Sequence, residues 1–450
     1  MKRIFLFLMA SVAMIAASAQ ITGQWTGEIS VSGFSLKLNF NFATDDSGKT
    51  TCTIDSPDQN AFDIPCQEVS ITDNSVNVKI DVIKATYSGT IQGDSIVGNF
   101  TQGATLPLTL RRNAKPQTKI ERKQTPQPPF PYTVKEVTFA NPAAGITLAG
   151  TLTLPENTKN VPAVVMITGS GAQNRDEELF AHRPFAVIAD YLTRQGIAVL
   201  RYDDRGTAAS GGKFANATTA DFATDARAAL DFLASQPEIN KKKLGYIGHS
   251  EGGQIAFINA AADDRVAFIV TLAAPAIKGS DLLIRQNEML VEAISGMKLP
   301  EDQLSPLKQI FDAIERNTDS ESLRKELIEI LKLDLATPEQ RENFEKQIEA
   351  STSPWYMQFV KYDPADAIKA TKCPVFALGG TYDIQVEAST NIARIKELCG
   401  SKSVTTKEYP GMNHMFQQCA NAKEGFNYGK IEQTIASEVL TDIATWILTQ

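Results

Sequence analysis

The stretch KLGYIGHSEGGQIAFINAA, residues 243–261, decides the fold class of this chain. An apolar run typical of a buried strand crosses the five residues GHSEG and continues at once as a helical pattern. So sharp a turn needs small residues on both sides, which Gly248 and Gly252 supply. It exposes the Ser250 hydroxyl at the start of a helix, where backbone N–H groups favour negative charge. The pattern predicts a nucleophilic serine, the alternative being a purely structural turn.

A serine hydroxyl needs a general base, and the chain has three histidines to choose from. His249 adjoins Ser250 in the turn and is expected to point away from its hydroxyl. His182 precedes the nucleophile at an expected helix start, which is more typical of a capping or packing residue. His414 lies in YPGMNHMFQ, a glycine-containing loop after an expected strand at 404–409. We therefore predict His414 as the base.

The base needs an acid that holds its tautomer and stabilises the imidazolium. Asp383 lies in CPVFALGGTYDIQV, directly after an expected strand at 375–379, and should emerge at the carboxyl edge of the sheet. Asp363 and Asp366 precede that strand and are more typical of helix caps. The resulting chain order is the one found in α/β-hydrolases: Ser250, Asp383, His414.

Negative charge that develops on a substrate oxygen needs backbone donors. One predicted donor is the N–H of Glu251, the residue after the nucleophile. The other is expected in ITGSGAQNRDEE, the loop after an expected strand at 164–168, where Ser170 is the first choice and Gly171 the second.

Two charged clusters near these loops have two interpretations each. Residues 175–177 (RDE) could recognise a polar leaving group, and residues 203–205 (DDR) could brace the rim of the site. The alternative for both is a solvated loop.

The second half of the chain alternates strands with helices. Apolar runs at 146–154, 163–168, 197–202, 244–248, 268–273 and 375–379 are separated by helical stretches such as 184–195 and 221–235. This alternation predicts an α/β domain over residues 132–450, with a mostly parallel sheet covered on both faces. A charged, helix-rich insertion at about 276–372 predicts a helical cap, the alternative being a packing layer without a functional role.

The first part of the chain has a different pattern. Residues 20–112 show period-two alternation and frequent turn signals, which predicts a small all-β domain, a sandwich or a partial barrel. The proline-rich stretch at 113–131 predicts a semi-rigid linker. Trp25, Phe34 and Tyr87 could form an aromatic platform that binds an envelope glycan, although core packing is the commoner fate of such residues.

The first nineteen residues have the pattern of a signal peptide. Lys2 and Arg3 precede an apolar stretch too short for a comfortable membrane span, and the small residues ASA end it. The pattern predicts an exported protein, periplasmic or secreted, without stable membrane insertion. In an oxidising compartment Cys52 and Cys66 could form a disulfide.

Composition limits the partners. The net charge of −8 gives no basic surplus for nucleic acid. No Cys/His cluster indicates a metal site, and we expect neither a metal nor an organic cofactor. The oligomeric state stays open.

Six segments together resemble one family. In chain order they are GSGAQNRDEE, ADYLTRQGIAVLRYDDRG, GYIGHSEGGQIA, SPWYMQFVKYDPADAI, PVFALGGTYDIQV and PGMNHMFQ. From about residue 132 to 450 the chain resembles the bacterial carboxylesterase branch of the α/β-hydrolases, which is serine-aminopeptidase-like and dienelactone-hydrolase-like. The resemblance implies an eight-stranded sheet, a helical cap and hydrolysis of small short-chain acyl esters through an acyl-serine. It puts Ser250, Asp383 and His414 at the triad positions. Thr168-Gly169 stands where many relatives carry His-Gly, and a peptidase on the same triad is the alternative.

Overall fold

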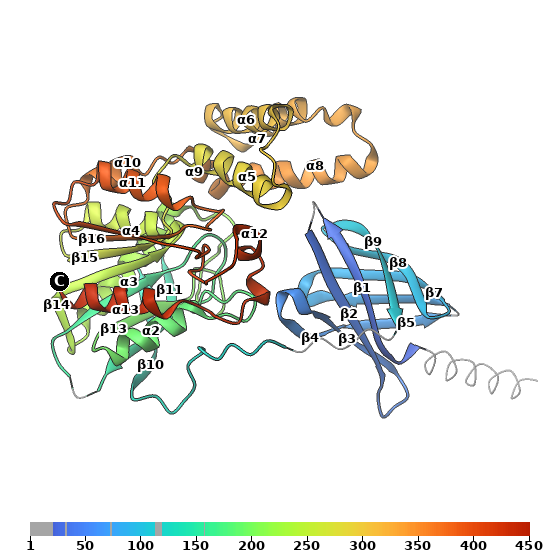
Figure 1. Cartoon of the computed structure of the whole chain (residues 1–450), viewed down its shortest axis with the longest axis horizontal. Helices are drawn as coiled ribbons and strands as arrows, with labels where there is room; N and C mark the ends of the chain where they lie inside the picture. The colour runs from blue at the N-terminus through green and yellow to red at the C-terminus, as the bar shows by residue number, and fades with distance from the viewer. Residues whose placement is uncertain (1–20, 32–33, 73, 113–118, 157) are drawn as a thin grey trace, which may run out of the picture. The chain divides into compact units, whose positions relative to one another are not determined.

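The computed structural model describes residues 21–31, 34–72, 74–112, 119–156 and 158–450. The expected signal peptide, residues 1–19, and residues 113–118 of the expected linker lie outside this range. The chain forms two compact units (Figure 1). The first runs to Glu121 and includes Asn427–Glu432, and the second comprises Arg122–Phe426 and Gln433–Gln450.

The first unit is one continuous antiparallel sheet of nine strands, in the order β4-β3-β2-β1-β9-β8-β7-β6-β5. Each strand pairs with its sequence neighbour, except that β1 pairs with β9 and β4 does not pair with β5. Contacts between β3 and β5 show that the sheet curls back on itself, so the domain is a partial barrel. The strands are β1 Gly23–Val31, β2 Phe34–Thr44, β3 Thr50–Ser56, β4 Ala61–Pro65, β5 Glu68–Thr72, β6 Ser75–Ile80, β7 Ala85–Gln92, β8 Ser95–Gln102 and β9 Ala104–Arg112.

The interior of this sheet is filled by its own side chains. Trp25 and Tyr87 are fully buried there, and each donates a hydrogen bond to a backbone carbonyl, Trp25 to Ile21 at 2.6 Å and Tyr87 to Ile96 at 3.0 Å. These two residues cannot form an exposed aromatic platform, so that alternative is wrong for both. They pack the core instead. The side chain of Phe34, the third residue of that alternative, lies outside the described part of the chain.

Cys52 and Cys66 lie beside each other in the first unit. The Cys66 N–H donates to the Cys52 carbonyl at 3.1 Å. Both are thiols in this structure, and a hydrogen bond with Cys66 together with burial raises the pKa of the Cys52 thiol. The side chains are therefore close enough to interact.

We predict that oxidation joins Cys52 to Cys66. Protein isolated from an oxidising compartment should resist alkylation at both positions before reduction, and peptide mapping by mass spectrometry measures this. Because a cross-link restricts the unfolded chain, Cys66→Ser should lower the free energy of unfolding of the oxidised protein by about 2–4 kcal/mol. Full alkylation of both thiols without reductant would contradict the prediction.

The second unit contains the eight-stranded sheet that the resemblance implies, in the order β10-β11-β13-β12-β14-β15-β16-β17. β11 pairs antiparallel with both of its neighbours, β10 and β13. All other neighbouring strands, from β13 through β12 to β17 in the sheet order, pair in parallel. The parallel strands are apolar and buried, because helices cover both faces. The strands are β10 Tyr132–Asn141, β11 Ile146–Pro155, β12 Val161–Ile167, β13 Ala198–Tyr202, β14 Ile239–His249, β15 Phe268–Leu272, β16 Val375–Gly380 and β17 Val404–Tyr409.

Two hydrophobic clusters, one on each face, hold the helices to this sheet. One face is covered by α3 Thr219–Ser235, α4 Glu251–Ala262, α10 Ala365–Ala370 and α11 Ala388–Leu398. The other is covered by α2 Pro184–Arg194 and α13 Ser437–Leu448, and the short α12 Ala422–Gly425 lies between β17 and α13 in the chain. In the described part of the chain no helix is long and apolar enough to cross a membrane.

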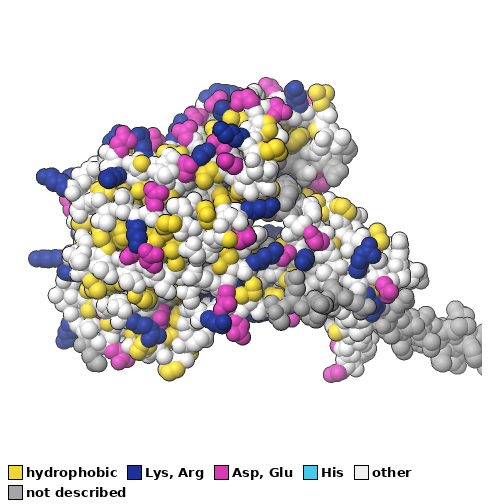
Figure 2. Space-filling model, in the orientation of Figure 1, with side chains coloured by type: hydrophobic (Ala, Val, Ile, Leu, Met, Phe, Trp, Pro, Cys, Tyr) yellow, Lys and Arg dark blue, Asp and Glu magenta, His cyan; other side chains and the backbone are white. Residues whose placement is uncertain are grey.

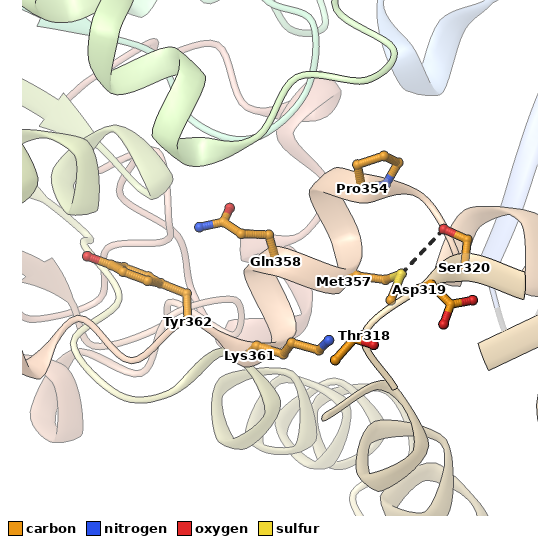
Figure 3. Close-up of a pocket in the computed structure, with 8 residues that line it drawn as sticks. All are labelled: Thr318, Asp319, Ser320, Pro354, Met357, Gln358, Lys361 and Tyr362. Carbon is orange, nitrogen blue, oxygen red and sulfur yellow. Dashed lines mark hydrogen bonds between the residues drawn. The ribbon is translucent and has the colours of Figure 1, made fainter. Parts of the chain in front are cut away.

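The insertion between β15 and β16 forms a helical layer with its own hydrophobic core (Figure 1). Its helices are α5 Gly279–Ser295, α6 Glu301–Arg316, α7 Ser320–Ile330, α8 Pro338–Ser351 and α9 Pro354–Lys361. The last helix of the expected cap range, α10, packs on α4 and so belongs to the sheet. A groove of about 570 Å³ lies along α9, with Gln358 and Lys361 in its wall (Figure 3).

Three residues of the expected linker make hydrogen bonds within the unit to which each belongs. In the first unit the Ile120 backbone exchanges two hydrogen bonds with the Asn60 side chain, at 2.7 and 2.9 Å. In the second, Arg122 donates to the Phe180 carbonyl and Gln124 accepts from the Thr434 N–H.

Candidate active site

Ser250 occupies the turn between β14 and α4. Its φ of 53° and ψ of −121° lie in a region that costs a non-glycine residue roughly 1–3 kcal/mol. The backbone closes tightly on both sides, since a Cβ on Gly248 would lie 2.1 Å from the Gly252 carbonyl oxygen. A Cβ on Gly252 would lie 2.2 Å from the Ile167 carbonyl oxygen at the end of β12. The two glycines therefore permit the strained turn that the sequence predicts.

Asp383 and His414 meet at the carboxyl edge of the sheet. They follow β16 and β17, which are adjacent and parallel, so both loops leave the same edge. Asp383 Oδ2 lies 2.7 Å from His414 Nδ1, and its Oδ1 accepts the N–H groups of Gln385 and Val386 at 2.8 and 2.9 Å. Both side chains are buried. The carboxylate is thus fixed from one side and orients the imidazole from the other.

The loop that carries His414 has its own supports. The Asn413 side chain accepts the N–H groups of Met415 and Gln417 and donates to the Gly425 carbonyl at 2.8 Å. His182 is fully buried, with Nε2 3.1 Å from the Gln417 side-chain nitrogen. Its position agrees with the expected packing role. No histidine is visible on the face of the molecule that Figure 2 shows.

His249 connects three parts of the site. Its ring turns to the Glu177 carboxylate, with Nδ1 2.9 Å from Oε1, and to the His414 carbonyl oxygen, 3.1 Å from Nε2. The His249 and His414 ring centroids are 4.7 Å apart. Sequence reasoning expected only that His249 would point away from Ser250 and did not identify these partners.

The loop after β12 lies against the nucleophile. A Cβ on Gly169 would be 3.2 Å from Ser250 Cβ, and the Gly169 N–H donates to Glu177 Oε1 at 2.7 Å. Among described residues, no acceptor is found for the backbone N–H groups of Ser170, Gly171 and Glu251. Those three groups are the donors that the sequence singles out for an oxyanion.

The Glu251 side chain is a feature that sequence reasoning missed. It is buried beneath the turn and accepts hydrogen bonds from Thr219 Oγ1 at 2.6 Å and from Trp355 Nε1 at 3.0 Å. Burial raises its pKa above the ordinary value. Because Trp355 lies on α9, this carboxyl ties the cap to the residue after the nucleophile.

The two charged clusters are ion-pair networks that are buried or, at Arg175 and Asp176, half-buried, so the solvated-loop interpretation is wrong for both. Arg175 donates to Asp203 through its side chain at 2.7 Å and its backbone N–H at 2.8 Å. Arg201 pairs with Asp176, and Arg205 pairs with Asp225 at 2.7 Å. Apart from Arg201 Nε, for which no partner is found among the described residues, their charged groups pair with one another, which suits bracing rather than recognition of a leaving group.

Asp204 braces the oxyanion loop directly. Its carboxyl oxygens accept from Thr168 Oγ1 at 2.8 Å and from the Gln173 N–H at 2.9 Å. Burial raises the pKa of this carboxyl to about 8, with smaller contributions from Glu177 and Asp225 that are opposed by the two hydrogen bonds.

The alternative acids are not at the site. Asp363 accepts the Ala365 N–H at 2.9 Å, and Asp366 lies in the first turn of α10, so both serve the start of that helix. Among the described residues no group of three or more His, Cys, Asp or Glu side chains is arranged to hold a metal ion.

The profile of the family described as serine aminopeptidase, S33, matches residues 182–418. The chain belongs to this family. It is therefore a member of the α/β-hydrolase superfamily, with an added β domain on its N-terminal side.

Curated relatives are distant. The chain is 35% identical over 149 residues to "Uncharacterized protein PA2218" of Pseudomonas aeruginosa, which covers 32% of this chain and 38% of that protein. It is 24% identical to "Esterase EstD" of Thermotoga maritima over 301 residues. These residues make up 67% of this chain and 65% of that protein. The chain thus spans less than two thirds of the length of either relative.

Among solved structures, the crystal structure of hypothetical protein PA2218 is similar with a TM-score of 0.46 and 20% identity, over 75% of this chain and 99% of that chain. Est1E from Butyrivibrio proteoclasticus with bound ferulic acid is similar with a TM-score of 0.42 and 18% identity, over 70% and 98%. At these scores neither likeness bears on function.

The Asp204 pKa leads to a stability prediction. A carboxyl whose pKa is raised by folding keeps its proton in the native state while the unfolded chain loses it, so stability falls as pH rises from about 4 to 8. An asparagine at this position cannot ionise, and Thr168 Oγ1 can accept from it as well as donate to it. We expect the free energy of unfolding of Asp204→Asn to exceed that of the wild type by about 1 kcal/mol or more between pH 5 and 8. Urea unfolding measures this difference.

The adjacent Asp203→Asn is the matched control. The pKa of Asp203 is lowered, because the hydrogen bonds from Arg175 and Ala209 outweigh the effect of burial. This variant should lose stability relative to the wild type over the same range. If the free energy of unfolding changed with pH in the same way in both variants, the prediction would be contradicted.

Proposed function

We propose that this protein is a serine carboxylesterase that cleaves short-chain acyl esters through an acyl-Ser250 intermediate. The observation that carries the proposal is the buried Asp383–His414 hydrogen bond of 2.7 Å, at the same sheet edge as the strained strand–helix turn that holds Ser250. Family membership and the esterase relative support it further.

In the proposed mechanism His414 Nε2 takes the proton of the Ser250 hydroxyl as the oxygen attacks the ester carbonyl. The tetrahedral oxyanion accepts hydrogen bonds from the Glu251 N–H and from Ser170 or Gly171. His414 then protonates the departing alkoxide, and the alcohol leaves. Water, deprotonated by His414, attacks the acyl group and releases the acid and Ser250. Asp383 stays ionised and stabilises the imidazolium.

The family description also names aminopeptidases, and a peptidase remains the second candidate. Recognition of a substrate amine would need a carboxylate with free acceptor capacity near Ser250. The Glu251 carboxyl already accepts from Thr219 and Trp355. Oε1 of Glu177 already accepts from the Gly169 N–H and contacts His249 Nδ1. This occupation favours esters.

We further propose that the enzyme is exported, to the periplasm or beyond. This rests on the pattern of residues 1–19 alone. Protein recovered from a periplasmic extract should begin near Gln20, which N-terminal sequencing determines.

Removal of the nucleophile is the first test. Ser250→Ala should reduce kcat/KM for p-nitrophenyl acetate by at least about a thousandfold, because the members of a triad act as a unit. The exposed Ser235→Ala, at the end of α3, is the matched control and should match the wild type within about twofold. Residual activity of Ser250→Ala above a tenth of wild type would refute the acyl-Ser250 route.

The second test separates ester from amide preference. A series of p-nitrophenyl esters with acyl chains of increasing length is compared with aminoacyl p-nitroanilides at equal concentration. We expect the highest kcat/KM with a short acyl ester and at least about a hundredfold lower values for the anilides, since the Glu251 carboxyl and Oε1 of Glu177 already have partners. Faster turnover of an anilide would establish the peptidase instead.

A further inference from the structure

Both ring nitrogens of His249 face oxygen atoms. Nε2 lies 3.1 Å from the carbonyl oxygen of His414, and Nδ1 lies 2.9 Å from Oε1 of Glu177. A carbonyl can only accept, so Nε2 carries a proton. A neutral imidazole has one N–H, which this contact already uses. The contact with Glu177 therefore needs a second proton.

Glu177 Oε1 is already an acceptor, because the Gly169 N–H donates to it at 2.7 Å. An ionised carboxylate satisfies both contacts at once, with Gly169 and a protonated His249 as its donors. The hydrogen-bond pattern thus fits a carboxylate–imidazolium pair in which every donor has an acceptor.

The pair lies in a dry environment. The side chains of Glu177 and His249 are 7% and 12% exposed. Phe185, Leu272 and Phe416 line a cavity of about 10 Å³ beside them, no larger than about one water molecule needs. Opposite charges attract strongly where water cannot screen them, so such a pair holds its geometry.

Glu177 also adopts an unusual backbone conformation. Its φ of 51° lies in the left-handed region, which is strained for a residue other than glycine. A tight turn, closed by its N–H to the Asn174 carbonyl at 2.9 Å, presents the carboxylate to the interior.

We propose that Glu177 and His249 form a buried carboxylate–imidazolium pair that positions the oxyanion loop and the base loop on either side of Ser250. The pair reaches the oxyanion loop through the Gly169 N–H and the base loop through the His414 carbonyl. It touches no reacting atom, so both are positioning residues. The link to catalysis rests on the proposed esterase function, whereas the charge state of His249 does not.

The groups around His249 together favour its protonated form. Burial lowers the pKa of His249, but Glu177, the His414 carbonyl and Asp383 raise it, and the net result lies above its ordinary value. The other titratable groups in reach are the ring of His414 and Asp204, which interacts with Glu177. Because the cation is lost as pH rises through a raised pKa, the pair should weaken on the alkaline side.

The charge state can be measured directly, because the chain has only three histidines. Untagged protein labelled with ¹³C at histidine Cε1 should give three signals, each assigned from its own His→Gln variant, and is titrated from pH 5 to 9. We expect His249 to stay cationic at pH 7.5 in the wild type and to be neutral there in Glu177→Gln. Removing an adjacent opposite charge shifts such a pKa by about 1–3 pH units. A neutral His249 at pH 6 in the wild type would overturn the proposal, whatever the activity.

Kinetics test the positioning role. Glu177→Gln keeps the size of the side chain but removes the negative charge that favours a protonated His249 at Oε1. We expect kcat for p-nitrophenyl acetate to fall about tenfold with little change in KM, and the alkaline limb of the pH profile to move to lower pH. The exposed neighbour Glu178→Gln carries the same change in charge and should behave like the wild type.

Equal profiles for the two variants would overturn the positioning role. If Glu177→Gln does not fold, His249→Gln provides the same comparison, because its amide can still donate to the His414 carbonyl but leaves Glu177 without its cation. Wild-type kcat and pH profile in that variant would also overturn the role.

Discussion

The close approach of the backbone at Gly248 and Gly252 is the constraint on which the site depends. Two carbonyl groups occupy the space where side chains would otherwise stand, and Ser250 is held in a conformation that it would not adopt freely. The turn brings the end of β14, the start of α4 and the end of β12 together at one point. A nucleophile and its backbone donors then follow from main-chain geometry alone.

Around this turn the site is built from buried carboxyl groups with different partners. Asp383 faces an imidazole and two N–H groups, Glu251 faces a hydroxyl and an indole, and Asp204 holds the oxyanion loop. Each carboxyl holds together segments that lie far apart in the sequence. The catalytic geometry is therefore maintained by polar contacts in a dry interior, where a broken hydrogen bond costs the most.

The sequence predicted those parts of the molecule that local pattern determines. Period-two alternation identified the β domain, and apolar strands separated by helices identified the hydrolase sheet and its cap, because burial imposes these periods. Ser250, Asp383 and His414 were recognisable because each follows a strand of one parallel sheet. Chain order then assigns each a candidate role.

The contacts between loops could not be predicted, because no local pattern links partners that are far apart in the sequence. Glu177 and His249 are 72 positions apart, and Glu251 and Trp355 are 104 apart. In the sequence, Glu177 is one acidic residue in a charged run, and nothing local marks it as buried. The burial of Trp25 and Tyr87 was likewise left open, because alternation alone does not tell which face of a curled sheet is filled.

The most direct measurement of the central claim is the site of acyl transfer. The enzyme is mixed with a p-nitrophenyl ester, quenched in acid during turnover, digested and mapped by tandem mass spectrometry. The account predicts that the acyl group is found on Ser250 and that His414→Ala forms no adduct. Turnover of the ester with the acyl group on another residue would contradict it.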